Sequence, residues 1–189
     1  MDFIDFIQQR QSTPPKYLVE PTPTHDELQR ILQTAESAPD HGALHPWRFL
    51  VIDQEQRDAL GDLFVHALLR RAPDTDPSLL ERERERALRA PMLIAAIANI
   101  TNDHPKIPAI EQFLAAAAAT QQVMLAANHL GYGTVWLTGN RIYDRFVMTG
   151  MGLSESELLL GLINVGTASV DKPIKMIRRS RAPVDYWRP

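Results

Sequence analysis

Apolar residues recur along the chain at spacings that predict both helices and strands. Spacings of three and four residues mark amphipathic helices, and short apolar runs bounded by Gly or Pro mark buried strands. Helices are predicted over residues 2–10, 77–89 and 109–130. Another helix is predicted from Thr24 to about Pro39, and a further one contains residues 60–68 and ends before Pro73. The predicted strands cover 47–52, 91–99, 133–139, 158–166 and 184–187. Helices and strands alternate without a regular strand–helix–strand rhythm, so the order favours an α+β fold over a doubly wound parallel sheet.

Local signals fix several helix ends. Thr24 and Glu27 have the spacing of a capping box, and Asp76 precedes Pro77 as an N-cap with proline in the first turn. Gly131 is placed to end the longest helix. That helix is apolar around most of its circumference, so we expect it to be buried on most sides.

The stretch "ERERERALR" (81–89) pairs opposite charges at helical spacing, as in Glu81 with Arg84, Glu83 with Arg86 and Glu85 with Arg89. This pattern is typical of a solvated helix face. A nucleic-acid surface is disfavoured because the glutamates cancel the positive field of the arginines.

Composition narrows the class of protein further. The chain has 189 residues, an even composition that predicts a single domain over 1–189, and a net charge of -3 that would not draw nucleic acid or an anionic membrane. It contains no cysteine, which rules out disulfides, thiolate metal sites and a Cys nucleophile. The N-terminus lacks the features of a signal peptide, and no apolar run is long enough to span a bilayer. We therefore expect a soluble, cytoplasmic protein.

The stretch "APDHGALHPWRFLVI" (38–52) concentrates groups that could carry chemistry. Asp40, His41 and His45 could hold a metal in a hydrolase, but their spacing matches no known ligand motif. A loop shaped to hold a flat ligand is the other interpretation. Pro39 would end the preceding helix and Pro46 would direct the chain into the strand, with Trp47 in the core rather than on a ligand.

Two basic segments could bind phosphate, although Walker and G-x-G-x-x-G loops are absent. "RQS" (10–12) follows the first helix and offers a guanidinium and a hydroxyl, and "RRSRAP" (178–183) offers three guanidinium groups near the chain end. For each segment taken alone, an exposed basic loop is an equally good explanation.

Taken together, these motifs resemble the flavin-dependent nitroreductase family. The resemblance rests on Arg-x-Ser after a first helix, "APDH" and "PWRF" in one loop, "GYGTVWLTG" (131–139) and the basic "RSRAP" (179–183), in this order along nearly the whole chain. The closest resemblance is to the short NAD(P)H nitroreductase branch.

The resemblance implies an α+β fold with a central, mainly antiparallel sheet and helices on both faces. It also implies an intertwined homodimer with two FMN molecules at the interface, in which the long Ala-rich helix lies between the chains and the strand at 184–187 is exchanged with the partner. The implied activity passes hydride from NAD(P)H through FMN to a nitroaromatic, a quinone or a related small acceptor.

Residue roles follow from the resemblance position by position. For the FMN phosphate and ribityl chain it implicates Arg10, Gln11, Ser12, Arg179 and Arg181, with Ser37 where the short branch often carries another Arg. For the flavin ring it implicates His41 and the strand end Trp136, Leu137, Thr138 and Gly139, where a backbone N–H can face the flavin N5. No catalytic side chain is expected, because hydride passes directly between stacked rings.

Three positions depart from the family pattern. Gln11 replaces a usual second Arg or Lys, and Ala43 and His45 stand where the wider family favours Asn and Gln. These departures leave open a second interpretation, a relative that binds or senses flavin without turnover.

Overall fold

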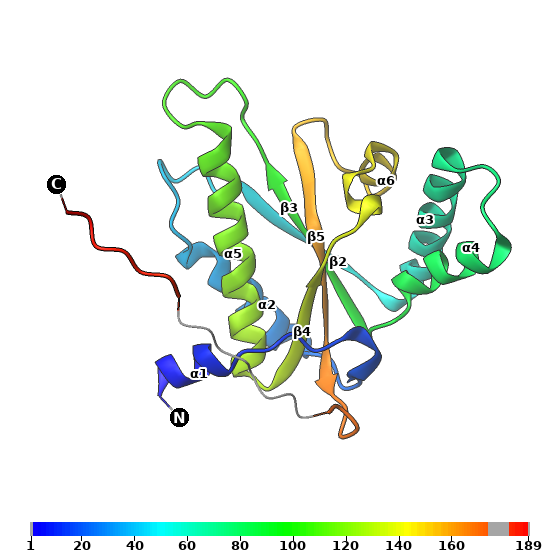
Figure 1. Cartoon of the computed structure of the whole chain (residues 1–189), viewed down its shortest axis with the longest axis horizontal. Coiled ribbons are helices and arrows are strands. Elements are labelled where there is room, and N and C mark those ends of the chain that lie inside the picture. Colours follow the sequence, from blue (N-terminus) through cyan, green and yellow to red (C-terminus); the bar gives the residue numbers. More distant parts are fainter. Residues whose placement is uncertain (1, 174–181, 189) are drawn as a thin grey trace.

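The computed structural model describes residues 2–173 and 182–188, and an antiparallel sheet lies at its centre (Figure 1). The five strands are β1 (Leu18–Val19), β2 (Trp47–Ile52), β3 (Met92–Asn99), β4 (Tyr132–Leu137) and β5 (Glu157–Ala168). β5 pairs with β4 on one side and with β3 on the other, β3 pairs with β2, and the short β1 joins the end of β5. In the described part of the chain β4 and β2 are therefore the outer strands.

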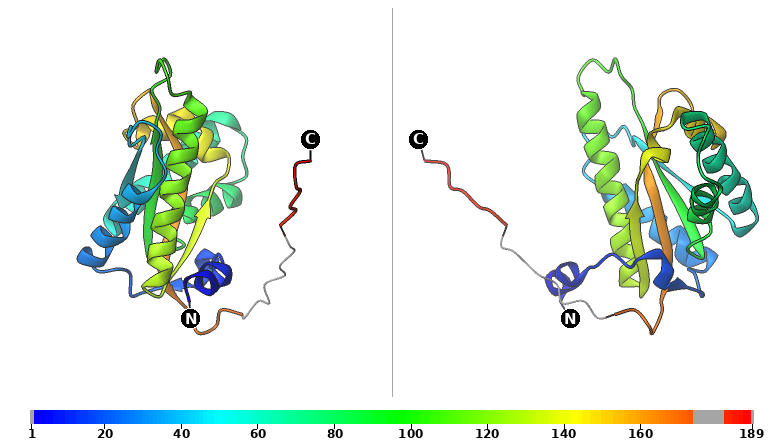
Figure 2. Two further views of the ribbon diagram at one scale, coloured as in Figure 1. Left: turned by 90° about the vertical axis from the view of Figure 1, so that its left-hand side faces the viewer. Right: turned by 45° about the vertical axis from the view of Figure 1, so that its right-hand side comes forward.

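Helices cover both faces of this sheet, which confirms the predicted α+β class. They are α1 (Phe3–Gln9), α2 (His25–Gln33), α3 (Arg57–Arg71), α4 (Pro77–Arg84), α5 (Ala109–His129) and α6 (Arg145–Gly150). Figure 2 shows α2 and α5 on one side of the sheet and α3 and α4 on the other.

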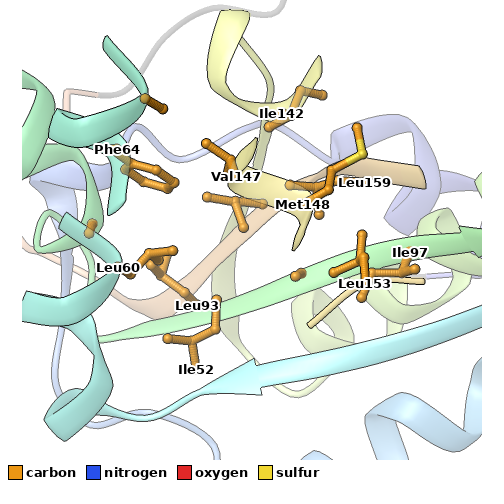
Figure 3. Packing of buried hydrophobic residues seen from close by; sticks show 14 residues of the cluster. Ile52, Leu60, Phe64, Leu93, Ile97, Ile142, Val147, Met148, Leu153 and Leu159 are labelled. Carbon is orange, nitrogen blue, oxygen red and sulfur yellow. The ribbon is translucent and has the colours of Figure 1, made fainter. Parts of the chain in front are cut away.

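The alternation of side chains along β3 separates two cores. Leu93 and Ile97 pack with α3 and α6 in the cluster of Figure 3, which also contains Phe64. Ile94 and Ala96 point to the opposite face and pack against α2 and α5. Every second residue of a strand points to the same face, so one continuous apolar run supplies both layers.

The predicted helix caps are confirmed. Thr24 and Glu27 form a reciprocal capping box on α2, and Asp76 accepts a hydrogen bond from the Ser78 N–H at the start of α4. Gly131 follows the end of α5 with φ +95°, a left-handed conformation that glycine adopts without strain.

The prediction of a solvated face on the charged helix is wrong in part. Of the three expected pairs, the structure forms Glu83 with Arg86, whereas Arg84 binds Asp62 of α3 and Glu83 also binds Arg141 beyond β4. Because α4 packs against α3, one side of the charged stretch turns toward the rest of the molecule.

The long helix α5 is buried or half-buried around most of its circumference, as predicted, and is exposed along one stripe. Ala116, Ala119 and Val123 are fully buried, but Ile110 and Leu114 are each 62% exposed. Ile110 and Leu114 are four residues apart, so their exposed side chains lie on the same outer face of the helix.

Short or unpartnered segments account for the other differences. β1 and α6 lie in stretches for which no strand or helix was predicted, and both are only two to six residues long. The strand predicted at 184–187 is absent, and the side chains of Val184, Tyr186 and Trp187 are exposed. A strand forms only beside another strand, and this segment has none within the described part of its own chain.

Candidate functional site

The segment that follows α1 runs along the outer edge of β4. The Thr13 N–H donates to the Thr134 carbonyl at 2.9 Å, which brings the predicted phosphate segment 10–12 to the start of that strand. A Cβ at Gly133 would lie 2.9 Å from the Thr13 hydroxyl oxygen, so glycine there permits this close approach.

A hollow of about 280 Å³ opens at this junction and is rich in nitrogen donors. It is lined by Phe6, Gln9, Arg10, Gln11, Thr13, Asn128, Gly131, Tyr132, Gly133, Ala168 and Lys172. Lys172 Nζ donates to the Thr13 hydroxyl at 3.1 Å, which holds a second cation beside Arg10.

Arg10 carries the clearest sign of a missing ligand. Its Nη1 is buried and has no hydrogen-bond partner among the described residues. Buried guanidinium N–H groups are normally paired, because an unmet donor loses its hydration without compensation. An anion in the hollow would supply the acceptor, so this site fits a phosphate group.

Sequence reasoning missed Lys172. Lys172 belongs to no motif in the sequence, and it comes close to Arg10 only because of the way the strands pair. Tyr132 is opposite Thr167, so the chain leaving β5 passes beside the start of β4 and reaches Arg10 from the other side. The antiparallel pairing of the two predicted strands was the one signal that could have found it.

The other predicted flavin segment lies at the far end of β4. The Trp136 indole packs in the core and donates to the Leu160 carbonyl at 3.1 Å, while Leu137 is partly exposed. A Cβ at Gly161 would lie 2.2 Å from the indole nitrogen, so this glycine makes room for Trp136. Gly139 has φ +131°, and the backbone turns there into the helical turn Asn140–Tyr143. Arg10–Ser12 and Thr138–Gly139 thus lie toward opposite ends of one edge strand.

The loop between α2 and β2 is strained. Gly42, Ala43 and His45 have φ values of +77°, +51° and +47°, a region that residues with side chains seldom adopt. Asp40 supports the loop by accepting the His45 backbone N–H at 2.7 Å. Strain of this kind persists where the surrounding structure holds it, and it is frequent at ligand sites.

The two predicted groups in this loop do not reach the Arg10 hollow. His41 Nδ1 lies 2.7 Å from Glu111 near the start of α5, whereas Asn128, near its end, lines the hollow. Seventeen residues of helix separate these contacts, which corresponds to about 25 Å along the axis. The Ser37 hydroxyl donates to the Thr34 carbonyl, and Ser37 does not line the Arg10 hollow, although Thr34 lies beside Ala126 and His129 near the end of α5. Figure 1 shows α1 at the lower end of α5 and the chain between α2 and β2 beside its upper part.

The second basic segment and the alternative metal site remain to be located in the structure. Arg179 and Arg181 lie outside the described residues. The side chains of the alternative metal set diverge, with His45 Nδ1 on Glu36 at 2.9 Å and His41 on Glu111. The described residues contain no group of three or more His, Asp or Glu placed to hold a metal ion.

Trp47 packs between two apolar clusters, as predicted.

None of the helices in the described part of the chain has the length and hydropathy needed to cross a bilayer.

Comparison with known proteins identifies the class. A family model described as "Nitroreductase family" matches residues 7–167. A Haemophilus influenzae protein named "Putative NAD(P)H nitroreductase" is 34% identical over 167 residues, which cover 88% of this chain and 89% of that protein. "Putative NAD(P)H nitroreductase YdjA" of Escherichia coli strain K12 is 30% identical, with 88% of each chain covered.

Solved structures agree on the fold. A nitroreductase-like family protein from Bacillus cereus superimposes with a TM-score of 0.77 at 24% identity, covering 97% of this chain and 92% of that one. A variant of the FMN and NADPH-dependent nitroreductase NfnB gives a TM-score of 0.73 at 17% identity, covering 98% and 99%. The chain belongs to the nitroreductase family, as its motifs indicated.

Proposed function

We propose that this protein is an NAD(P)H-dependent oxidoreductase that uses FMN to reduce nitroaromatic, quinone or related small acceptors. The observation that carries the proposal is the buried, unpaired Nη1 of Arg10 in a cationic hollow beside β4. The curated relatives are named NAD(P)H nitroreductases, which supports NAD(P)H as the reductant. The structural neighbour NfnB is FMN-dependent, which supports FMN as the cofactor.

The residues at the two ends of β4 divide the task of holding FMN. Arg10, Ser12 and Lys172 would bind the phosphate, and the backbone at Thr138–Gly139 would face the ring. When bound, FMN supplies the hydride chemistry, and the chain supplies position, electrostatics and exclusion of water. No side chain needs to move a proton for hydride to pass between stacked rings.

We infer that each FMN is held by two chains. Its contact with Glu111 holds His41 about 25 Å along α5 from the Arg10 hollow, so His41 cannot serve the same flavin in one chain. A second copy, packed on the exposed apolar residues of α5, would bring its own strained loop to the hollow. Ile110 and Leu114 are the apolar residues of α5 that this contact would cover.

We propose that the tail of one chain pairs with β2 of the other. In the described residues β2 is an outer strand with one partner, and hollows of about 760 and 420 Å³ adjoin it. An added strand places alternate side chains on opposite faces, so the partner's 184–187 segment would fill both hollows while pairing with β2.

The test of the function begins with the absorption spectrum of the protein as purified. We expect a yellow protein whose released cofactor runs as FMN on chromatography, and steady-state oxidation of NADH or NADPH with a quinone. A colourless protein that takes up no added FMN would refute the proposal. A protein that binds FMN but shows no turnover with any acceptor would support the flavin-sensing alternative instead.

A further inference from the structure

The Glu83 carboxylate of α4 points into the molecule and not toward the charged outer surface of that helix. Glu83 Oε1 accepts from Arg141 Nε at 2.7 Å and its Oε2 accepts from Arg141 Nη2 at 3.3 Å. The Glu83 and Arg141 side chains are only 12% and 11% exposed. Arg86 adds a second cation at 2.8 Å. Glu83 is thus shared by two arginines in a site with little water.

Arg141 connects this cluster to the segment proposed to face the flavin ring. Its Nη1 lies 3.4 Å from the Thr138 carbonyl, and its guanidinium lies over the Phe64 ring, 5.4 Å from the centroid. A Cβ at Gly139 would lie 3.2 Å from the same Nη1. The guanidinium is therefore packed against the Thr138–Gly139 backbone, with little room to move.

The Glu83 carboxyl group is ionised at neutral pH. Burial alone would raise the Glu83 pKa, but hydrogen bonding and charge from Arg141, together with Arg86, outweigh burial and hold the pKa below its ordinary value. The positive charge of Arg141 therefore lies against the Thr138–Gly139 backbone, and the negative charge of Glu83 largely cancels its field.

We propose that Glu83 and Arg141 are positioning residues that hold the Thr138–Gly139 backbone and set the charge beside the flavin, and thereby its reduction potential. This inference rests on the proposed function. Reduction adds negative charge to the ring, so an uncancelled cation nearby favours the reduced form and an uncancelled carboxylate disfavours it. In a site with little water, such charges act strongly.

The test is the midpoint potential of bound FMN in the holoprotein and in four variants. Glu83→Gln leaves Arg141 uncancelled and should shift the potential upward. Arg141→Gln leaves the Glu83 carboxylate paired with Arg86 alone, and should shift the potential downward. The Glu83→Gln/Arg141→Gln double variant should return toward the wild-type value. Glu81→Gln, on the exposed side of the same helix, is the matched control and should leave the potential unchanged.

A merely structural role predicts a different result. Loss of packing would lower the melting temperature of each variant without shifts of opposite sign in potential. Should Arg141→Gln fail to fold, Arg141→Lys replaces it. Lys keeps the charge and should match the wild type, while Glu83→Gln still moves upward. Wild-type FMN uptake with unchanged or same-sign shifts in the single variants would overturn this inference and leave the proposed function standing, whereas absence of FMN uptake by the wild type would overturn both.

Discussion

The proposal that Arg10 binds phosphate rests on both the sequence motif and the structure. The Arg-x-Ser motif after the first helix suggested a phosphate ligand, and the structure adds a second cation, Lys172, and a buried donor without a partner. A charge-assisted contact of this kind contributes about 1.5–3 kcal/mol.

Replacing Arg10 with Ala should therefore weaken FMN binding by roughly ten- to a hundred-fold, since 1.4 kcal/mol corresponds to a factor of ten. The measurement is an FMN titration of apoprotein. Excess FMN should restore the melting temperature of the variant, because a ligand that binds only the folded state stabilises it. Arg82→Ala, an exposed arginine of α4, is the control. Unchanged affinity in Arg10→Ala would remove the phosphate assignment.

The lowered pKa of Glu157 predicts how the folding stability of the protein depends on pH. Hydrogen bonding to Arg48, aided by the Ser154 backbone N–H and opposed by burial, lowers the Glu157 pKa to about 2. A folded-state pKa below the ordinary value of 4.5 stabilises the fold above that pH, and this stabilisation is lost as the pH falls toward 2. Arg48 is 40% exposed, so solvent weakens the pair, and we expect a contribution of about 1–3 kcal/mol at neutral pH.

Chemical unfolding of the wild type and Glu157→Gln over this pH range measures that contribution. The difference in unfolding free energy should be largest at neutral pH and shrink as the solution is acidified below pH 4.5. Glu155→Gln, at an exposed position in the same turn, should show no such difference. A constant gap between wild type and Glu157→Gln would contradict the assignment.

Other residues of the proposed site could not be found from the sequence, because their contacts are long-range. The local charge pattern around Glu83 matches a solvated helix, and only the packing of α4 on α3 reveals its contact with Arg141, 58 positions away. The contact of His41 with Glu111 crosses 70 positions. Motifs therefore identified Arg10 and the strand after Gly131, whereas tertiary packing selected Lys172 and Glu83.

Among the elements, those with strong local signals were predicted well. β2 begins and ends at the predicted residues, and α2 has the capping box expected from Thr24 and Glu27. β1 and α6 were not predicted, because two and six residues carry too little periodicity. The tail at 184–187 has the composition of a strand but lacks a neighbour in the described part of its own chain.

The cap on α2 gives a prediction at this scale. Thr24→Ala should lower stability by about 1 kcal/mol, because the Glu27 backbone N–H loses its acceptor. Thr24→Ser should retain wild-type stability, since serine caps as well as threonine. Thermal unfolding of the three proteins decides this. Equal destabilisation by Ala and Ser would mean that the threonine methyl group, not the cap, matters.

For the whole molecule, the proposed dimer rests on the exposed apolar residues of α5 and on the exposed tail. Deleting residues 182–189 should leave a protein that aggregates or loses FMN, because β2 and its hollows would lack their cover. Sedimentation and flavin absorbance of the truncated protein test this. A well-folded, yellow monomer would show that the tail is not exchanged.

The central claim is that residues of two chains hold each flavin, and subunit complementation tests it most directly. One chain carries Arg10→Ala and the other carries His41→Glu, which places a second carboxylate against Glu111 and displaces the loop. Each variant alone should bind FMN poorly. In the mixed dimer one site combines both defects and the other has an intact Arg10 and an intact loop. We therefore predict one tightly bound FMN per mixed dimer in a titration. Mixed dimers that bind no FMN tightly, or His41→Glu homodimers with wild-type affinity, would contradict a site built from two chains.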